Sequence, residues 1–336
     1  MFGDHRSRPD QGFGPVQAPP LYICASLSRG RLASAGPSLS RYLTLETANV
    51  QIRLRSSAIA AADNCRRLLQ YQYLLKVEPV AVAANLAFGR CIDISLREYL
   101  RALTLGQSLP DPVARFQALW GEQQTQPLVY SKTQSHPTFA RMGVSLMRAF
   151  PACWEASGFV VAVNSRGDTL LDVSLSQSIG RIGRLEVVLD GTLDMLAYTP
   201  EAELAIVDVK TAASAHTALY THRSDQLTVY QILVEAHRGR LGLPPLRHLG
   251  FLDLLKRRAT ARIDKPCLVP VRSRAELDEF KQKCFWLAED IARGRFPRSS
   301  RMQFNSPCEL CAYSRHCVHG DAAGLRFPAE PVKRLA

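Results

Sequence analysis

The sequence predicts an α/β protein in which a central mixed sheet is flanked by helices, with a helical N-terminal part and a cysteine-containing C-terminal loop. Three observations support this prediction. Apolar residues recur at helical spacing over much of residues 57–157. From Gly158 onward, short strand-like segments are followed by a helix and another strand. Near the C-terminus, three cysteines lie within ten residues, 308–317.

The length of 336 residues and the formal net charge of +12 narrow the class of protein. A chain of this length can bury a sizeable core, as one large domain or two medium ones. Its positive charge favours an anionic partner, nucleic acid before membrane. No apolar run approaches the roughly 18 residues of a membrane helix, and the N-terminus lacks a secretory apolar core. We therefore expect a cytoplasmic protein that does not bind membranes.

Composition and pattern divide the chain into five segments. Residues 1–45 are rich in Pro, Gly, Ser and Arg, and we expect them to form a flexible basic tail. The other four segments are a helical part at 46–157, an α/β core at 158–300, a cysteine loop at 301–320 and a second tail at 321–336.

The elements are predicted in the following order. Ser57 caps a helix that runs through residues 58–76, and Pro79 ends this unit. The later helices are predicted at about 84–105, at two places within 111–157 on either side of a Gln-rich stretch at 122–137, and at 224–237 and 275–293. Besides a central hairpin, strands are predicted at 159–163, 169–175, 185–189, 248–255 and 261–271.

Residues 191–211 predict a β-hairpin that contains charged residues between apolar ones. Its turn covers residues 199–203, where Pro200 suits an early turn position. If the turn centres on Glu201, the opposed pairs are Thr192 with Lys210, Asp194 with Asp208, and Leu196 with Ile206. One face then carries Leu193, Met195, Ala205 and Val207, and the other carries Leu196, Tyr198, Leu204 and Ile206. Strands that are apolar on both faces are typically buried.

The charged residues Asp194, Asp208 and Lys210 are therefore expected to lie together at the end of a buried face. Facing carboxylates repel each other, and unpaired buried charge costs several kcal/mol. A hard divalent cation, Mg²⁺ or Mn²⁺, would relieve this cost and keep bound waters for a phosphate substrate. The alternative is a surface hairpin end at which Lys210 bridges the two acids.

Two polar residues follow on the helix after the hairpin. Gln226 and Tyr230 are four residues apart, so they share one helix face. Facing the acidic site, they could hold a substrate phosphate or a base. The alternative is a pair of polar residues on a solvated face.

The C-terminal cysteines, Cys308, Cys311 and Cys317, have metal-ligand spacing. Three thiols are one ligand short of a closed zinc or iron-sulfur site. His316 or His319 could supply the fourth ligand to Zn²⁺, and Cys65 is the other candidate. The remaining cysteines show no ligand spacing and are expected to be small buried or incidental residues: Cys24, Cys91, Cys153, Cys267 and Cys284.

Taken in order, these motifs resemble the RecB-like branch of the PD-(D/E)xK nucleases. The resemblance is closest to its iron-sulfur members, such as the nuclease domain of the AddB helicase subunit and the CRISPR-adaptation nucleases. It spans about residues 52–320 and rests on Phe88-Gly89 to Asp93, Gly191-Thr-Leu-Asp194, Ile206-Val-Asp208-Val-Lys210-Thr211, Gln226-x-x-x-Tyr230, and Cys65 with the later C-x2-C-x5-C.

The resemblance implies a restriction-endonuclease-like core and a role for each motif. Asp194 and Asp208 would hold the metal, Lys210 would orient or polarise the attacking water, and Gln226 and Tyr230 would line the DNA path. A 4Fe-4S cluster would be held by Cys65, Cys308, Cys311 and Cys317. Where the family usually has histidine this chain has Asp93, which can still ligate a hard cation. Glu186 and Asp172 are further candidate acids.

The implied function is a metal-dependent, exonuclease-like DNA nuclease that acts in repair, recombination or mobile-element processing. The chain has no G-x-x-x-x-G-K-[ST] loop, so unwinding would require a helicase or recombination partner. Two alternatives stay open. One is a catalytically weak relative that binds DNA or a helicase partner, and the other is a zinc-stabilised nucleic-acid-binding protein.

Overall fold

The computed structural model describes residues 50–125, 127–256, 262–263, 265–299 and 307–328. The predicted tail at 1–45 and Cys24 lie outside these residues, as does most of the linker before the cysteine loop. No helix in the described ranges is both long enough and apolar enough to cross a membrane.

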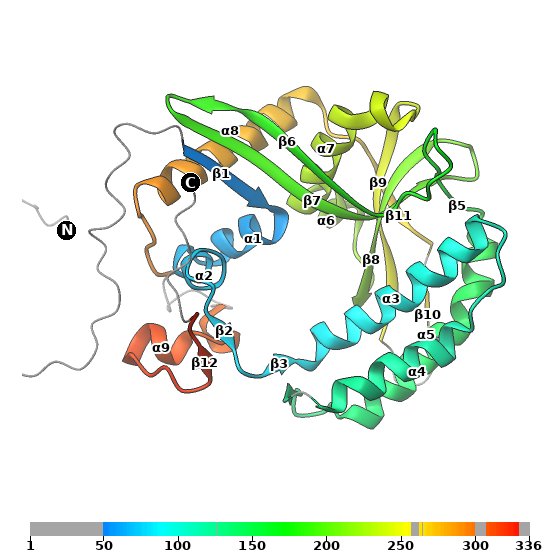
Figure 1. Cartoon of the computed structure of the whole chain (residues 1–336), viewed down its shortest axis with the longest axis horizontal. Helices are drawn as coiled ribbons and strands as arrows, with labels where there is room; N and C mark the ends of the chain where they lie inside the picture. Colours follow the sequence, from blue (N-terminus) through cyan, green and yellow to red (C-terminus); the bar gives the residue numbers. More distant parts are fainter. Residues whose placement is uncertain (1–49, 126, 257–261, 264, 300–306, 329–336) are drawn as a thin grey trace, which may run out of the picture. The chain divides into compact units, whose positions relative to one another are not determined.

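A mixed sheet of eight strands forms the centre of the fold (Figure 1). Its strands are β1 (Val50–Arg55), β5 (Val160–Val161), β6 (Leu171–Ile182), β7 (Leu185–Tyr198), β8 (Leu204–Ala212), β9 (Leu246–Leu255), β10 (Arg262–Ile263) and β11 (Cys267–Pro270). The pairs β1–β7 and β8–β9 are parallel, whereas β6–β7 and β7–β8 are antiparallel. The predicted α/β class with a central mixed sheet is confirmed.

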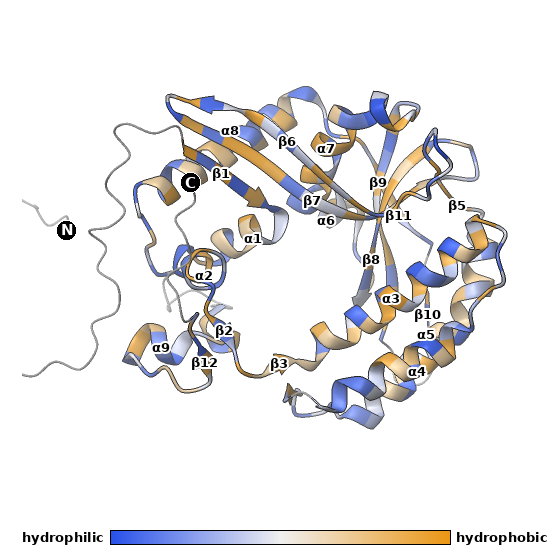
Figure 2. Cartoon of the chain, in the orientation of Figure 1, coloured by the Kyte–Doolittle hydropathy of each residue, from blue (hydrophilic) through white to orange (hydrophobic). Residues whose placement is uncertain are grey.

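Helices cover both faces of the sheet. One core contains buried residues of α1 (Ser56–Asn64), α7 (Asp225–Leu241) and α8 (Arg274–Ala292). The other contains buried residues of α3 (Ala84–Thr104), α4 (Pro112–Glu122) and α5 (His136–Ser157). In Figure 2, hydrophobic and hydrophilic residues alternate along α3, α4 and α5, as expected for helices with one buried side.

The shorter elements connect these layers. They are α2 (Arg66–Leu69), a π-helix (Gln70–Leu74), β2 (Glu78–Pro79), β3 (Val82–Ala83), a 3₁₀ turn (Gln123–Thr125), β4 (Leu128–Val129), α6 (Ala218–His222), a second 3₁₀ turn (Pro307–Leu310), α9 (Ser314–His319) and β12 (Leu325–Arg326). The antiparallel pair β2–β12 joins the C-terminal residues to the segment after α2.

One edge of β7 changes partner along its length. β6 follows the other edge from Leu185 to Met195. On the first edge, residues 185–190 pair with β1 and residues 195–198 pair with β8. Residues 191–194 therefore have no strand partner on that edge among the described residues, and the sheet forks there. Asp194, one of the predicted site residues, lies at this fork.

The strand faces also change at the fork. Leu193 packs in the core with Leu196 and Ile206, whereas Met195 packs in the opposite core. The prediction that Leu193 and Met195 share one face is therefore wrong. The switch coincides with a backbone irregularity in β6, because Asp172, between the residues that pair with Leu193 and Met195, has a φ of +58°.

Several predicted boundaries also differ from the structure. The expected helix over 58–76 is interrupted at Cys65, whose backbone is extended at φ −167° and ψ 122°. Its N-cap is Arg55 rather than Ser57, because β1 runs directly into α1. Strand β1 was not predicted. The segments at 185–189 and 191–198 form one strand of 14 residues, and the strand expected at 261–271 is split into β10 and β11.

Candidate active site

The turn that brings β7 and β8 together has the predicted form. Thr199 N–H donates to Glu203 O at 2.9 Å, and Leu196 lies opposite Ile206 as expected. Ladder pairing ends at Met195 and Val207, so Asp194 and Asp208 are not a regular cross-strand pair. Instead, Asp194 Oδ2 accepts a hydrogen bond from the Val209 N–H at 2.9 Å. The carboxylate thus binds a backbone donor of β8 just beyond the last paired rung.

Asp208 is the most buried of the predicted site residues, with an exposed fraction of 0%. Its Oδ1 accepts from Gln226 Nε2 at 2.8 Å, and its Oδ2 lies 2.5 Å from Lys210 Nζ. The Lys210 ammonium is thus the ion-pair partner of the buried Oδ2. Burial and the charge of Asp194 raise the pKa of Asp208 to about 7, against the opposing effect of Lys210.

Lys210 supplies positive charge to both acids. Burial alone would lower the pKa of its ammonium, but Asp208 and Asp194 outweigh this effect and raise it. Burial also raises the pKa of Asp194, opposed by the charge of Lys210 and the Val209 hydrogen bond. About a third of the Lys210 side chain is exposed, so a substrate can reach it, whereas Asp208 is fully buried.

Helix α3 brings Asp93 to the same group. Its pKa is raised to about 6 by burial and by the charge of Asp194, with Lys210 acting in the opposite direction. Arg97, one turn along α3, pairs with Asp93 at 3.0 Å and also with Asp172. Gly89, one turn earlier, packs against β8, because a Cβ there would lie 3.4 Å from Thr211 Oγ1.

Of the two further candidate acids, Asp172 lies at the site and Glu186 does not. Asp172 belongs to the edge of the site, since it raises the pKa of Asp93 and shares Arg97 with it. Glu186 interacts with Gln51, Ser178 and Arg181 instead. These contacts leave it outside the group around Asp208.

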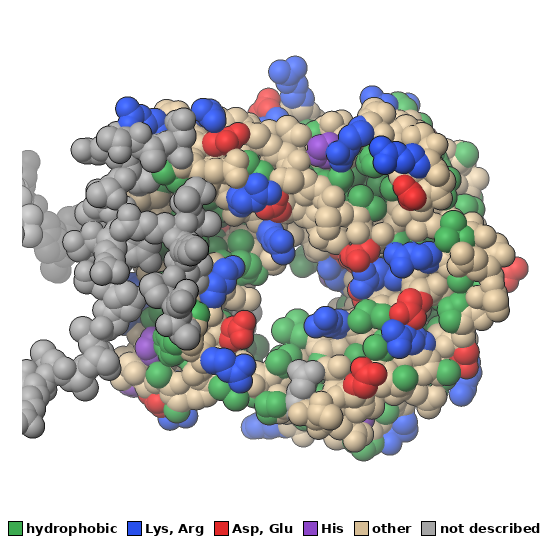
Figure 3. Space-filling view, in the orientation of Figure 1, with side chains coloured by type: hydrophobic (Ala, Val, Ile, Leu, Met, Phe, Trp, Pro, Cys, Tyr) green, Lys and Arg blue, Asp and Glu red, His purple; other side chains and the backbone are tan. Residues whose placement is uncertain are grey.

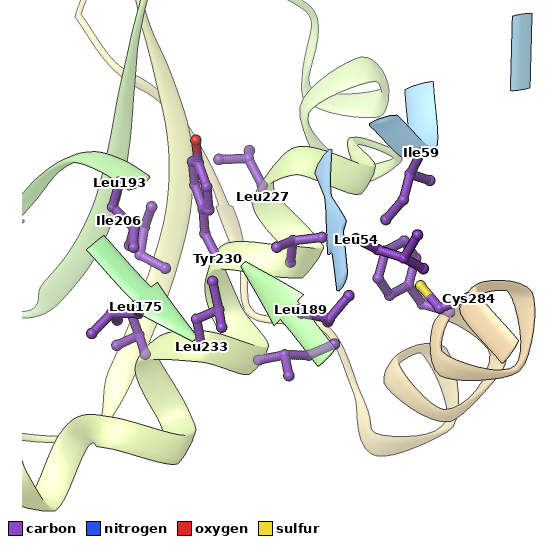
Figure 4. Close-up of a cluster of buried hydrophobic side chains, with 14 of the residues drawn as sticks. Leu54, Ile59, Leu175, Leu189, Leu193, Ile206, Leu227, Tyr230, Leu233 and Cys284 are labelled. Carbon is purple, nitrogen blue, oxygen red and sulfur yellow. The ribbon is translucent and has the colours of Figure 1, made fainter. Parts of the chain in front are cut away.

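Gln226 and Tyr230 face the acids, as their spacing predicts. Gln226 Nε2 donates to Asp208 Oδ1 and also to the Tyr230 hydroxyl at 2.9 Å. Tyr230 is 4% exposed, and burial together with the charge of Asp208 raises its pKa. In Figure 4, its ring packs among apolar side chains while its hydroxyl points away from them. In this arrangement Tyr230 supports Gln226 rather than presenting its ring to a ligand.

The acidic group suits a hard cation in its chemistry. In the described residues, no group of three or more His, Cys, Asp or Glu side chains is arranged to hold an ion as it stands. Mg²⁺, however, is commonly bound by one or two carboxylates with waters and substrate phosphate. Asp194 and Asp208 provide carboxylate oxygens, and the buried Asp208 Oδ2 already faces one cation, the Lys210 ammonium. The residues therefore fit such an ion.

The cysteines form a second group. Burial raises the pKa of Cys311, and Cys308, Cys65 and Cys317 add to the increase, so these three cysteines lie near Cys311. Burial would also raise the pKa of Cys65, but hydrogen bonds, chiefly from the Ser299 N–H at 3.4 Å, lower it overall. A lowered thiol pKa favours the thiolate, which is the metal-binding form.

The remaining cysteine predictions are partly confirmed. Cys91 and Cys284 are buried, as expected, whereas Cys153 and Cys267 are half-buried. His316 packs between the rings of Tyr71 and Phe327, at centroid distances of 5.4 and 5.3 Å.

Three contacts hold the cysteine region to the start of the fold, and we call this set the C-terminal clasp. The Tyr313 hydroxyl donates to Val77 O at 2.8 Å, Ser299 Oγ donates to Asn64 O at 2.6 Å, and β12 pairs with β2. The break at Cys65 is part of this junction. It turns the cysteine out of a continuous helix toward Ser299.

Basic side chains surround an opening beside the site. Figure 3 shows Lys and Arg gathered around a hollow between α1, α3 and β8. This arrangement agrees with the formal net charge of +12 and gives a polyanion an approach to the acidic group.

Sequence reasoning missed two features of the site. Arg97 lies four residues after Asp93, and this helical spacing could have identified it. A pair formed by His216 and the buried Asp253 lies beside Lys210 in the sheet. Those two residues are 37 positions apart, and no local pattern links them.

Residues 54–318 match the family model of the PD-(D/E)XK nuclease superfamily. A solved protein of Eubacterium rectale, provisionally named an exonuclease, is similar at 11% identity and a TM-score of 0.45, covering 89% of this chain and 97% of its own. The solved structure of SSO0001 is similar at 12% identity and a TM-score of 0.35, covering 83% and 91%.

No curated protein matches the sequence. The family match, in contrast, covers more than three quarters of the chain and includes every motif discussed above. All strands of the sheet except most of β1, the acids on β7 and β8, and the helix that carries Gln226 and Tyr230 fall within it. The chain belongs to the PD-(D/E)XK nuclease superfamily.

Proposed function

We propose that the protein is a metal-dependent DNA nuclease that hydrolyses phosphodiester bonds in an exonuclease-like manner. The observation that carries the proposal is the fully buried carboxylate of Asp208, which lies near a second acid, Asp194, with Lys210 as its paired cation. Two buried acids that share one ammonium keep excess negative charge in the fold, which costs stability. A divalent cation would neutralise that charge.

The residues take the following roles in the proposal. Asp194 and Asp208 hold the cation, with Asp93 as a third acid. A divalent ion there would lower the pKa of a bound water and neutralise charge on the scissile phosphate. Lys210 orients the attacking water, since its ammonium is tethered to Asp208 and still partly exposed. Gln226 fixes the Asp208 carboxylate through Oδ1, and Tyr230 fixes Gln226.

The four cysteines have a structural role in the proposal. Cys65, Cys308, Cys311 and Cys317 hold a 4Fe-4S cluster, supported by the effect of the other three thiols on Cys311 and by the lowered pKa of Cys65. Cys65 is preferred to His316 as the fourth ligand because Cys65 is among the groups that act on Cys311. Phosphodiester hydrolysis transfers no electrons, so the cluster would reinforce the C-terminal clasp.

The test is cleavage of labelled single-stranded and duplex DNA in the presence of Mg²⁺ or Mn²⁺, with EDTA as the blank. The matched variants are Lys210→Ala and Lys281→Ala, since Lys281 pairs only with Asp278 on α8 among its described contacts. We expect Lys210→Ala to lose cleavage by at least about 100-fold, a loss typical of removing one group that stabilises the transition state. DNA binding should persist. Parental cleavage by Lys210→Ala would overturn the site assignment.

A protein that binds DNA but cuts no substrate with either metal would support the alternative, a catalytically weak relative that partners a helicase. A repair, recombination or mobile-element role belongs to the same proposal. It would be tested by asking whether a co-purified helicase changes the rate of cleavage.

A further inference from the structure

One exposed aromatic residue lies at the margin of the site, and its ring packs against other aromatic side chains. Tyr220 on α6 is 59% exposed, yet its ring packs against His216 at a centroid distance of 4.7 Å and an interplanar angle of 38°. His216 in turn packs on Phe251, which is 2% exposed, at 4.6 Å. Tyr220 also lies 6.1 Å from the Phe251 ring, so the three tilted rings form a cluster that leads from the core to solvent.

A buried carboxylate holds the His216 ring of this cluster in place. Asp253 is 2% exposed, and its Oδ2 accepts from the His216 backbone N–H at 2.7 Å. Its Oδ1 lies 2.6 Å from His216 Nδ1. Because the carboxylate engages both the backbone and the ring, His216 is held at two points and cannot turn away from Tyr220 without leaving a buried charge unpaired.

The ring cluster lies next to β8, the strand that carries Asp208 and Lys210. In the parallel register of β8 and β9, Phe251 is beside Asp208 and Asp253 is beside Lys210. Lys210 Nζ lies 5.8 Å from the centre of the Phe251 ring. The Tyr220 ring lies 6.1 Å from the same Phe251 ring. The outer ring is therefore near the group that is proposed to act on the phosphate.

The ring is preorganised in a way that another exposed aromatic is not. Trp286 on α8 is 60% exposed, and the described contacts give it no ring partner. A ring that stays exposed to solvent gains little free energy from burial. Holding that ring in one orientation also costs side-chain rotamer freedom. A fixed exposed ring beside a lysine in a basic protein suits a ligand with a flat face and a negative charge, which is a nucleotide.

We propose that Tyr220, supported by His216 and Asp253, is a stacking site for one unpaired nucleobase of the DNA strand that Lys210 and the acids cut. The proposal rests on the nuclease function proposed above. Stacking onto a single ring requires a base with a free face, which the interior of a duplex does not offer. Tyr220 would thereby place the adjoining phosphate relative to Lys210, as a positioning residue and not as a group that reacts.

The first test measures binding of a fluorescent single-stranded oligonucleotide in EDTA, where no cleavage interferes. Since stacking on one aromatic ring contributes about 1–3 kcal/mol by alanine substitution, Tyr220→Ala should weaken binding roughly 10-fold or more. Tyr220→Phe should bind like the parent because it keeps the ring, and Trp286→Ala is the control for loss of an exposed aromatic. Tyr220→Ala should melt at the parental temperature.

The second test pairs the variant with the ligand. A set of oligonucleotides, each with one abasic position, should include one that binds the parent more weakly and binds Tyr220→Ala no more weakly than the intact strand. The same variant should raise KM for cleavage more than it lowers kcat. Parental binding by Tyr220→Ala, an equal loss in Trp286→Ala, or an equal loss for blunt duplex would each overturn the stacking site.

The two proposals can fail separately. If the parent cuts DNA and Tyr220→Ala is unchanged, only the stacking site is lost. If the parent binds single strands through Tyr220 but cuts nothing with Mg²⁺ or Mn²⁺, the stacking site stands and the nuclease function fails.

Discussion

Asp194 Oδ2 accepts the backbone N–H of Val209 at 2.9 Å, although the two strands that carry these residues have already stopped pairing. The contact satisfies a donor that the fork in the sheet would otherwise leave unpaired. It also fixes one oxygen of Asp194, while the neighbouring Asp208 carboxylate is held by Gln226 and Lys210. The local end of strand pairing thus directs both carboxylates of the candidate site.

The metal-free protein should lose stability as the pH rises from about 4 to about 7, between the unfolded and folded pKa values of Asp208. Asp208 has a pKa of about 7 in the folded state against 3.8 for an ordinary aspartate. The folded state therefore favours the protonated carboxyl, and stability present near the unfolded pKa is lost as the pH rises toward the folded value. We expect a falling melting temperature in EDTA over this range, recorded by circular dichroism.

Asp208→Asn should reduce this dependence and be more stable than the parent at pH 8. The difference should be on the order of 1 kcal/mol or more, since one pKa unit corresponds to about 1.4 kcal/mol. At pH 5 the two proteins should be closer. An unchanged pH slope in the variant would show that Asp208 does not cause the loss.

Asp93→Ala should raise the Mn²⁺ or Mg²⁺ concentration required for half-maximal cleavage, because it removes a third acid from the neighbourhood of Asp194. Asp93→His, which restores the residue usual in the family, should remain active. Glu98→Ala is the control on the same helix, since Glu98 pairs with Arg115. Full activity of Asp93→Ala at parental metal concentrations would place Asp93 outside the metal site.

Cys65→Ala should lose the brown colour expected of a cluster and become sensitive to protease. Cross-linking across more than 200 residues is worth about 5 kcal/mol in the chain-entropy model, comparable to the net stability of a domain. The hydrogen bond from Tyr313 to Val77 retains part of the clasp without the cluster. Cys153→Ala, which alters a half-buried cysteine on α5, is the control. A coloured, protease-resistant Cys65→Ala would return the fourth ligand to His316, His319 or an external group.

Gly191→Ala and Gly239→Ala should change stability in opposite directions. A Cβ at Gly191 would lie 2.7 Å from Leu233 Cδ1 and 3.1 Å from the Tyr230 ring. Overpacking of this kind costs about 1–3 kcal/mol and would also displace Tyr230 from Gln226. A Cβ at Gly239, on α7, meets nothing within 4 Å, so alanine there should stabilise by about 0.5–1 kcal/mol. Chemical denaturation measures both, and equal effects would contradict the close packing at Gly191.

The sequence sufficed for the parts of the site that depend on local periodicity. The turn centred on Glu201, the pairing of Leu196 with Ile206 and the common face of Gln226 and Tyr230 all follow from spacing along one element. The fork in β7 could not be predicted in this way. It depends on β1, whose residues pair with a strand about 135 positions later.

Features that depend on residues far apart in the sequence could not be predicted either. The face switch between Leu193 and Met195 arises where Asp172 on β6 takes a positive φ, and an alternating pattern gives no sign of it. The break at Cys65 interrupts a segment with good helical periodicity, because tertiary contacts with Ser299 override local propensity.

The C-terminal clasp can form only late in the synthesis of the chain. Translation proceeds from the N-terminus, so residues 64–79 leave the ribosome long before Ser299, Tyr313 and β12 exist to bind them. The acids on β7 and β8 and their partner Gln226 are all synthesised in between. A nascent chain can thus form β7, β8 and α7 before the contacts of the C-terminal clasp exist. Premature termination before Ser299 would release these elements without the clasp.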